Sequence, residues 1–457
     1  MAGVTGVRTL IEVSPGETRA ATVDQRLVEF QIDRKDRPSL IGGIYRGRVT
    51  RIEPGLGGAF VAIGTAREGF LRHGKGLHEG QAVTMQVIRD ADGAKGPALT
   101  TRIALTGRYV GWTPSRPGSV YSPRLGGGRR TAELEALAPN LVSDGEGIVF
   151  RAAAVRVKDD VVARETVRLR QEWAALEVAA RDAAAPATLI EPPSLIARIL
   201  RDGGDDGVII DDRASYNAAL SMIAATMPDR VLYRHDTTEP IFDAYGMADE
   251  IAAVSARIVT VPRGARLTFD ATEALMAIDV DSAAGGRGVA EDAILKTNIA
   301  ALAEVARQIR LRNLSGLIVI DFISMARRAS NTRLLQAAKK AFRRDPQQVD
   351  VLGISAAGLL EVTRRRHAPP IDSYLLQRGP AQQTPEAAAC EILRDALRSS
   401  GGAMPQLFAA PDIIAALQGP FSDALAQVNR RLGQDMALNR VPGKVDWEIT
   451  TQRGRRT

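Results

Sequence analysis

Two short apolar segments of this 457-residue chain carry aspartates that could hold a metal ion. Segment 272–281 ends with Asp279 and Asp281, and segment 316–323 contains Asp321 near its end. The length and apolar content of both segments predict β-strands. Because residues two apart share a face of a strand, Asp279 and Asp281 are expected to point to the same side.

The residues between these segments predict a helix that brings the aspartates together. Apolar residues recur there at steps of three and four, at Leu295, Ile299, Leu302, Val305 and Ile309. Strand, helix and strand in this order predict a parallel crossover, which places both carboxyl ends at one edge of a sheet. Open α/β sheets bind ligands at that edge. We therefore expect Asp279 and Asp321 to lie close together.

Carboxylates gathered at one sheet edge repel one another. Left unpaired and partly buried, they would cost several kcal/mol or take up protons. Mg²⁺ removes this repulsion, and it typically binds through one or two carboxylates, waters and substrate phosphate oxygens. In the structural alternative, Asp279 and Asp321 cap neighbouring helices or pair with surface arginines. Two similar strand ends in one unit favour the metal site.

The ordered motifs of this core resemble the ribonuclease E/G family. The matching stretches are AIDVDS (277–282), RG (287–288), TN (297–298), ARQIRLRNL (306–314) and GLIVIDFISM (316–325). Members of this family are single-strand endoribonucleases that use Mg²⁺, and their metal-holding aspartates fall on Asp279 and Asp321. The resemblance thus implies Mg²⁺-dependent cleavage of single-stranded RNA in RNA processing or decay. We expect Asp281, which shares a strand face with Asp279, to be an auxiliary catalytic residue.

Residues 39–108 predict a small β-barrel, because they contain many short strand patterns separated by Gly-rich turns. The segment resembles an S1-type RNA-binding barrel. Such barrels stack bases on aromatic rings beside basic groups. By this resemblance Phe60, Phe70 and Lys95 contact RNA, whereas the alternative places both phenylalanines in the barrel core.

Residues 147–154 resemble the part of the family that senses the 5′ end of RNA. In the family an Arg-Thr pair grips a 5′-monophosphate. Here Arg151 keeps the bidentate donor that suits phosphate, but Ala152 lacks the hydroxyl. The resemblance suggests Arg124 as a second phosphate-binding arginine. Arg151 as a surface arginine at a strand end is the alternative.

The expected fold is therefore an α/β multidomain fold. The resemblance implies ribonuclease-H-like and DNase-I-like α/β subdomains with an inserted S1-type β-barrel and a 5′-sensor subdomain. The expected parts are the first ribonuclease-H-like segment (1–38), the barrel (39–108), the 5′-sensor-like part (109–205), the second ribonuclease-H-like segment (206–258), the DNase-I-like catalytic part (259–370) and a small C-terminal α/β domain (371–457).

The chain departs from the family pattern in three ways. Asp281 stands where an amide is usual, and Ser324 where a second acid is usual. The Cys-Pro-x-Cys zinc link that joins subunits in many members is missing, so a homodimer would form without it. Three residues, Asp281, Ser324 and Ala152, keep a second hypothesis open, a non-catalytic single-stranded RNA-binding protein of the same family. A DNA-directed nuclease is a third hypothesis.

Composition excludes several classes of protein. The net charge of +7 favours a polyanionic partner. The single cysteine, Cys390, excludes an internal disulfide framework and a cysteine-rich zinc site. The apolar runs are far shorter than a membrane span, and the N-terminus has no signal-peptide pattern. We therefore expect a soluble cytoplasmic protein with no membrane partner.

Overall fold

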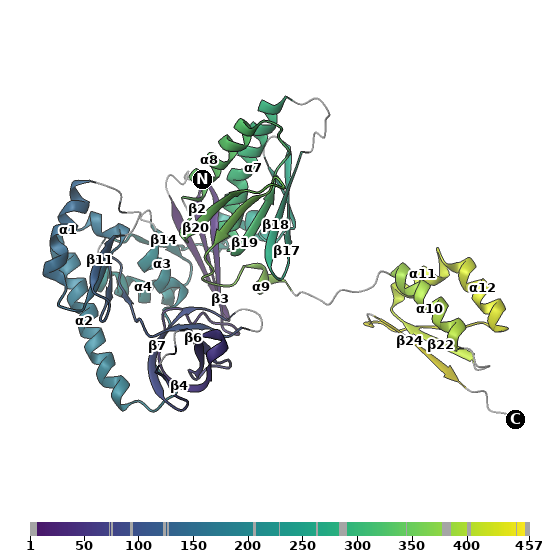
Figure 1. Cartoon of the computed structure of the whole chain (residues 1–457), viewed down its shortest axis with the longest axis horizontal. Helices are drawn as coiled ribbons and strands as arrows, with labels where there is room; N and C mark the ends of the chain where they lie inside the picture. Colours follow the sequence, from purple (N-terminus) through teal and green to yellow (C-terminus); the bar gives the residue numbers. More distant parts are fainter. Residues whose placement is uncertain are drawn as a thin grey trace. The chain divides into compact units, whose positions relative to one another are not determined.

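The computed structural model describes most of the chain (Figure 1). The described residues are 7–72, 74, 76–91, 95–121, 125, 128–203, 207–227, 229–261, 264–282, 290–343, 345–376, 385–399, 404–444 and 446–452. The chain forms two compact units, Met1–Leu376 and Gln377–Thr457. Among the described residues, no helix has the length and apolar character needed to cross a membrane.

A five-stranded mixed sheet joins two distant segments of the chain. Its order is β15 (Leu232–Arg234), β14 (Val208–Ile210), β1 (Arg8–Ser14), β2 (Glu17–Asp24) and β3 (Arg26–Arg34). The β1–β2 turn uses Gly16 at φ +95°, a conformation that glycine adopts without steric cost. β1 pairs antiparallel with β2 and parallel with β14, so the N-terminal hairpin and residues 208–234 form one sheet. Helix α3 (Leu195–Asp202) precedes β14, α4 (Arg213–Thr226) lies between β14 and β15, and α5 (Ile241–Ala244) and α6 (Ala248–Ala252) follow β15.

A closed β-barrel confirms that the short strand patterns with Gly-rich turns form a barrel. Its strands are β4 (Ile44–Glu53), β5 (Gly58–Ala62), β6 (Gly69–Arg72), β8 (Ala98–Thr100) and β7 (Ala82–Arg89), and β4 also pairs with β7 to close the ring. A short 3₁₀ helix, η1 (Pro54–Leu56), joins β4 to β5. A sixth strand, β13 (Ala187–Ile190), adds to β4 from outside the predicted segment.

The next part combines a small sheet with two helices. Its sheet has the order β11 (Gly118–Tyr121), β12 (Gly147–Phe150), β10 (Val110–Thr113) and β9 (Leu105–Thr106). Helix α1 (Arg129–Leu141), the 3₁₀ helix η3 (Ala152–Arg156) and the long helix α2 (Asp159–Asp182) complete it. Helix α2 begins with two aspartates, which suit its positive N-terminal end.

A six-stranded sheet covered by two helices contains the segments with the aspartates. Its order is β16 (Ile258–Val261), β17 (Ala265–Ala271), β18 (Leu275–Ser282), β19 (Gly316–Asp321), β21 (Leu360–Arg364) and β20 (Val349–Ile354). Helices α7 (Glu291–Leu311) and α8 (Arg328–Phe342) pack their apolar stripes against one face of this sheet (Figure 1). A one-turn helix, α9 (Asp372–Leu375), ends the first unit.

The second unit is a small α/β domain. Its three strands, in the order β23 (Ala437–Arg440), β22 (Met404–Ala409) and β24 (Trp447–Gln452), form a mixed sheet. Helices α10 (Pro385–Ser399), α11 (Pro411–Gln418) and α12 (Ser422–Leu432) share one apolar core with these strands. Cys390 lies half-buried in α10.

Candidate functional site

Asp279 and Asp321 are register partners on neighbouring parallel strands. β18 pairs with β19 so that Asp279 lies directly opposite Asp321. Their neighbours Ile278, Val280 and Ile320 are buried under α7 and α8, whereas both aspartates are exposed. Since side chains alternate along a strand, the carboxylates project from the uncovered face of the sheet. The crossover topology therefore juxtaposes the two aspartates as the sequence predicted.

The carboxylates destabilise each other's ionised form. The pKa of Asp279 is raised, first by its partial burial and then by the negative charges of Asp281 and Asp321. Asp281 pairs with Arg266 on the adjacent strand β17, at 3.0 Å between Arg266 Nη2 and Asp281 Oδ2. Arg266 therefore offsets part of the negative charge that Asp281 adds to the site.

Polar contacts fix the segments beside this edge. Glu291 at the start of α7 accepts hydrogen bonds from Arg327 N (2.9 Å) and Ser330 Oγ (2.7 Å). Asn298, which is fully buried, donates from Nδ2 to the carbonyl of Ile323 at 2.8 Å. These contacts hold the chain that follows Asp321 against α7. The RG motif at 287–288 lies outside the described residues.

The donor set suits a hard cation held by few protein ligands. In the described part of the chain, no group of three or more His, Cys, Asp or Glu residues could hold a metal ion. Asp279 and Asp321 offer two carboxylates without thiolate or imidazole. Mg²⁺ accepts such a set, because waters and phosphate oxygens complete its shell, whereas structural zinc requires four protein ligands.

Phe60 and Phe70 form a pair on the outside of the barrel. They are cross-strand partners on β5 and β6, with ring centroids 5.3 Å apart in an edge-to-face arrangement. Both rings are half-buried, and neither belongs to the buried barrel core, which includes Tyr45. Packing in that core therefore does not account for the two phenylalanines. Such a ring pair can accept a stacked base.

Lys95 is exposed beside the strand that carries Phe70. The next residue, Gly96, packs so closely on the Glu68 carbonyl that an added Cβ would lie 1.9 Å from it. Phe70 N donates to the carbonyl of Pro97 at 2.8 Å. The structure thus brings Lys95 close in the fold to the Phe60–Phe70 pair.

Arg51 is a further residue of the barrel surface that the sequence analysis missed. Its guanidinium carbon lies 4.5 Å from the centroid of the Phe60 ring, a cation–π distance. The residues are neighbours because Arg51 pairs with Phe60 across β4 and β5. A bulge in this pairing shifts the register, so the alternation of β4 alone did not indicate the contact.

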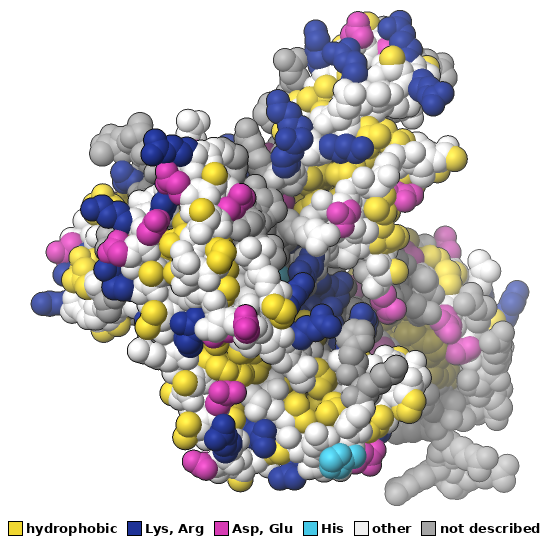
Figure 2. Space-filling model, turned by 60° about the vertical axis from the view of Figure 1, so that its left-hand side comes forward, with side chains coloured by type: hydrophobic (Ala, Val, Ile, Leu, Met, Phe, Trp, Pro, Cys, Tyr) yellow, Lys and Arg dark blue, Asp and Glu magenta, His cyan; other side chains and the backbone are white. Residues whose placement is uncertain are grey.

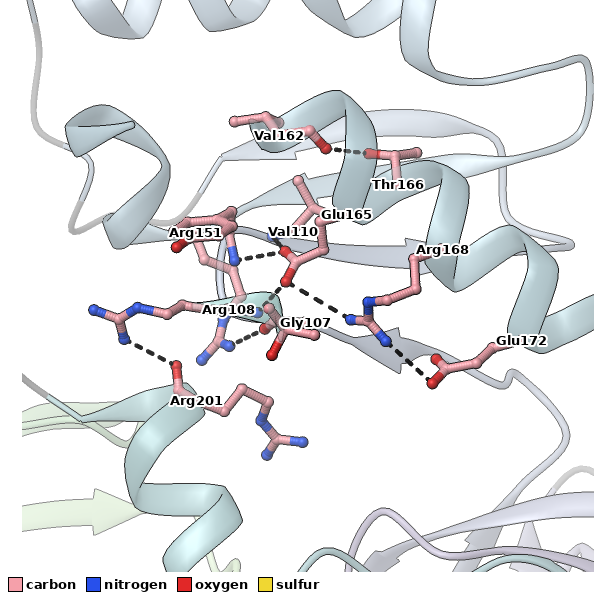
Figure 3. Close-up of polar contacts among 12 residues, drawn as sticks. Gly107, Arg108, Val110, Arg151, Val162, Glu165, Thr166, Arg168, Glu172 and Arg201 are labelled. Atoms are coloured by element: carbon pink, nitrogen blue, oxygen red, sulfur yellow. Dashed lines mark hydrogen bonds and ion pairs between the residues drawn. The ribbon is translucent and has the colours of Figure 1, made fainter. Parts of the chain in front are cut away.

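Arg151 lies between the small sheet and α3 and already has protein partners. Its guanidinium donates to the carbonyl of Gly107 (Figure 3) and to Asp202 Oδ1, the latter at 2.5 Å. Asp202 also binds Arg201, so two arginines share one carboxylate. A phosphate at Arg151 would compete with Asp202. The second expected arginine, Arg124, lies outside the described residues.

A large, arginine-rich cavity opens beside Arg151. Its volume is about 1000 Å³, and it lies between the five-stranded sheet, the barrel and α2. The arginines that line it are Arg151, Arg168, Arg198, Arg201, Arg310, Arg364 and Arg365. Figure 2 shows a hollow between lobes with Lys and Arg side chains in it. Such a cavity can accommodate an anionic group, although acidic residues including Glu29 and Asp90 also line it.

Known proteins resemble this chain over most of its length. The family model described as "Ribonuclease E/G family" matches residues 104–367. Ribonuclease G of Escherichia coli (strain K12) is 31% identical, over 95% of this chain and 96% of that protein. Ribonuclease G of Haemophilus influenzae is 30% identical, over 86% and 87%. Ribonuclease E of Escherichia coli is 36% identical over 77% of this chain, but only 36% of that longer protein is covered.

These matches confirm the resemblance inferred from the motifs of the core. The matched region includes β18, α7 and β19 with both Asp279 and Asp321. The chain therefore belongs to the ribonuclease E/G family.

Proposed function

We propose that the chain is an endoribonuclease that cleaves single-stranded RNA in RNA processing or decay, with Mg²⁺ bound by Asp279 and Asp321. The observation that carries this proposal is the parallel register that sets these two aspartates side by side on an exposed sheet face. Relatives named Ribonuclease G and Ribonuclease E support the type of reaction.

The three aspartates of the site would have different roles in catalysis. Asp279 and Asp321 would hold Mg²⁺, which supplies Lewis-acid stabilisation of the phosphate and a more acidic water. Asp281, paired with Arg266, would act as an auxiliary residue that tunes the ionisation of Asp279. Because the carboxylates project from an uncovered sheet face, an extended RNA strand could reach them without rearrangement of the helices.

The barrel would bind the RNA beside the cut. Bases would stack on Phe60 and Phe70, while Arg51 and Lys95 would neutralise phosphates. Arg151 and its cavity would form a 5′-phosphate pocket in which the phosphate displaces Asp202. We further propose that the five-stranded sheet is ribonuclease-H-like, the six-stranded sheet DNase-I-like and the β9–β12 part 5′-sensor-like, with the predicted bounds, and that the chain forms a homodimer without a zinc link.

Cleavage of a short AU-rich single-stranded RNA tests the proposed function. We expect cutting in Mg²⁺ and none in EDTA, with DNA of the same sequence left intact. A 5′-monophosphate should accelerate cutting relative to a 5′-hydroxyl if Arg151 releases Asp202. If the RNA binds but stays intact in Mg²⁺, the chain would instead be a non-catalytic RNA-binding protein. The observation that favours this second function is the ion pair between Asp281 and Arg266 beside the proposed metal ligands.

The stacking role of Phe60 predicts a loss of affinity on truncation. Phe60→Ala should weaken binding of single-stranded RNA by about 1–3 kcal/mol, the usual contribution of one stacked base. Fluorescence anisotropy in EDTA measures this affinity without cleavage. Leu220→Ala, which truncates an exposed apolar side chain on α4, is the matched control. Equal affinity in both variants would remove Phe60 from the RNA-binding surface.

A further inference from the structure

Helix α8 belongs to a stretch of sequence that has no acidic residue. Between Asp321 and Asp345 the chain contains no Asp or Glu. The same interval contains the basic residues Arg327, Arg328, Arg333, Lys339, Lys340, Arg343 and Arg344, of which the last lies outside the described residues. Such a block of like charge is typical of a surface that binds a polyanion.

The packing of α8 turns these cations outward. Ser330, Leu334, Ala338 and Phe342 recur every four residues and are buried against the sheet and α7. The exposed residues include Arg328, Arg333, Lys339, Lys340 and Arg343. We call these five residues the α8 cationic face. At 100° per residue, all five lie on the half of the helix opposite the buried row.

The α8 cationic face is not neutralised within the described part of the protein. None of its five side chains takes part in a hydrogen bond or ion pair with another described residue. Helix α2 provides a contrast, because Arg164 pairs with Asp160 at 2.6 Å and Arg168 with Glu172 at 3.1 Å, four residues away in each case. Like charges at such spacing weaken a helix by about 0.2–0.5 kcal/mol per pair. A bound polyanion would remove this repulsion.

The position of α8 connects this surface with the carboxylate edge. Only residues 322–327 separate Asp321 from the helix, and Glu291 holds Arg327 and Ser330 beside the start of α7. With 15 residues, α8 extends roughly 22 Å from that edge. Figure 2 shows several Lys and Arg side chains on the upper lobe, which holds α7 and α8.

We propose that the α8 cationic face is a second RNA-binding surface, which holds the phosphates of the RNA strand that extends beyond the carboxylate edge. This inference rests on the proposed function. The five residues include no aromatic side chain, so binding would depend on RNA length and salt rather than on base sequence. The large apolar residues of α8 pack on the core, Leu334 and Phe342 buried and Leu335 partly buried, which leaves no broad apolar face to insert into a membrane.

The test compares two triple variants of the full chain. Arg333→Gln, Lys339→Gln and Lys340→Gln together remove three charges from the α8 cationic face. The control replaces Arg129, Arg164 and Arg234 by Gln. It removes the same number of exposed or half-exposed arginines, each of which already pairs with an acid: Glu133 (2.8 Å), Asp160 (2.6 Å) and Asp236 (2.7 Å).

Binding of short and long polyuridine RNA is measured in EDTA at several salt concentrations. For long RNA, the α8 variant should bind about 10- to 100-fold more weakly at 0.1 M salt, and the salt slope should fall by roughly 2, since each single-strand phosphate contact contributes about 0.7. Short RNA that occupies only the barrel should bind as before. The control variant should keep both the affinity and the slope.

Wild-type affinity and slope in the α8 variant would overturn the inference. The inference would also be overturned if the α8 variant bound RNA as wild type does but no longer bound vesicles containing anionic lipid. The α8 cationic face would then be a membrane-binding surface. Gln preserves helix propensity, so the thermal midpoint of the α8 variant should not fall. Because binding is measured without cleavage, a chain that binds RNA but never cuts it would refute the proposed function and leave this result standing.

Discussion

Asp279→Asn and Asp321→Asn should each lower RNA cleavage by at least about 10²–10³-fold, the usual cost of losing one electrostatic stabiliser of a transition state. Each change removes one of two facing carboxylates, and with it one of the two proposed ligands of the divalent cation. RNA binding should persist, because Phe60 and Phe70 lie on a different sheet. Multiple-turnover cleavage in Mg²⁺ and RNA affinity in EDTA measure the two effects separately.

Loss of folding should not explain this loss of activity. The pKa of Asp279 is raised in the fold, first by partial burial and then by neighbouring carboxylates, so its ionised form is disfavoured there. Because the fold disfavours the charged form of Asp279, replacement by neutral Asn should leave the thermal midpoint equal or raise it. Asp270→Asn on β17 is the matched control, because Asp270 is also exposed and pairs with Arg257 at 2.7 Å. Cleavage that persists in both Asp279→Asn and Asp321→Asn would contradict the assignment of these two residues as metal ligands.

Sequence patterns predicted the β18–α7–β19 unit because its signals are local. Helical spacing marked α7, and two short apolar runs marked the strands. The parallel crossover then determined which strand ends meet. The juxtaposition of Asp279 and Asp321 therefore followed from the order of the elements. In the same way, short strands with Gly-rich turns were sufficient to indicate the barrel.

Partners supplied by distant segments could not be predicted. Residues 183–193 have the composition of an Ala/Pro-rich connection, yet β13 forms there because β4 offers it an edge far away in the sequence. The Asp281–Arg266 and Arg151–Asp202 pairs likewise depend on strand register and on the placement of α3. Local periodicity contains no information about such contacts.

Glu165 illustrates a signal that was present but incomplete. It lies between Val162 and Leu169 on the buried stripe of α2, so an inward-facing carboxylate could be inferred from spacing alone. The groups that donate hydrogen bonds to this carboxylate could not be inferred from spacing. Its oxygens accept hydrogen bonds from the backbone N–H groups of Arg108, Tyr109 and Val110 at 2.7–2.9 Å (Figure 3). These donors lie more than fifty residues earlier in the chain.

The residues just before β10 also form the contact with the largest expected effect on stability. Arg108 is 1% exposed and forms a bidentate pair with Asp229, with nitrogen–oxygen distances of 2.6–2.9 Å. Tyr109 also donates its hydroxyl to Asp229, at 2.5 Å. Asp229→Asn keeps the volume but removes the carboxylate to which the buried Arg108 guanidinium donates. We expect it to lower the free energy of unfolding by about 3–5 kcal/mol.

The pH dependence of this loss identifies its cause. Burial alone would raise the pKa of Asp229, but hydrogen bonds from Arg108 and Tyr109 outweigh it and lower that pKa. The pair therefore contributes its full stabilisation at pH values above the ordinary pKa of an aspartate, which is about 4. This stabilisation is lost as the pH falls through the lowered pKa of Asp229. The difference between wild type and Asp229→Asn should be full at pH 7 and shrink only below about pH 4.

Denaturant unfolding followed by tryptophan fluorescence measures this difference, since Trp112 and Trp173 lie in the same part of the chain, with ring centroids 6.5 Å apart. Asp236→Asn is the control, because its pair with Arg234 is solvent-exposed on the aspartate side and should contribute no more than about 1 kcal/mol. Equal losses in the two variants, or a difference that does not change at acid pH, would show that the buried charge pair does not stabilise the junction between β10 and α3.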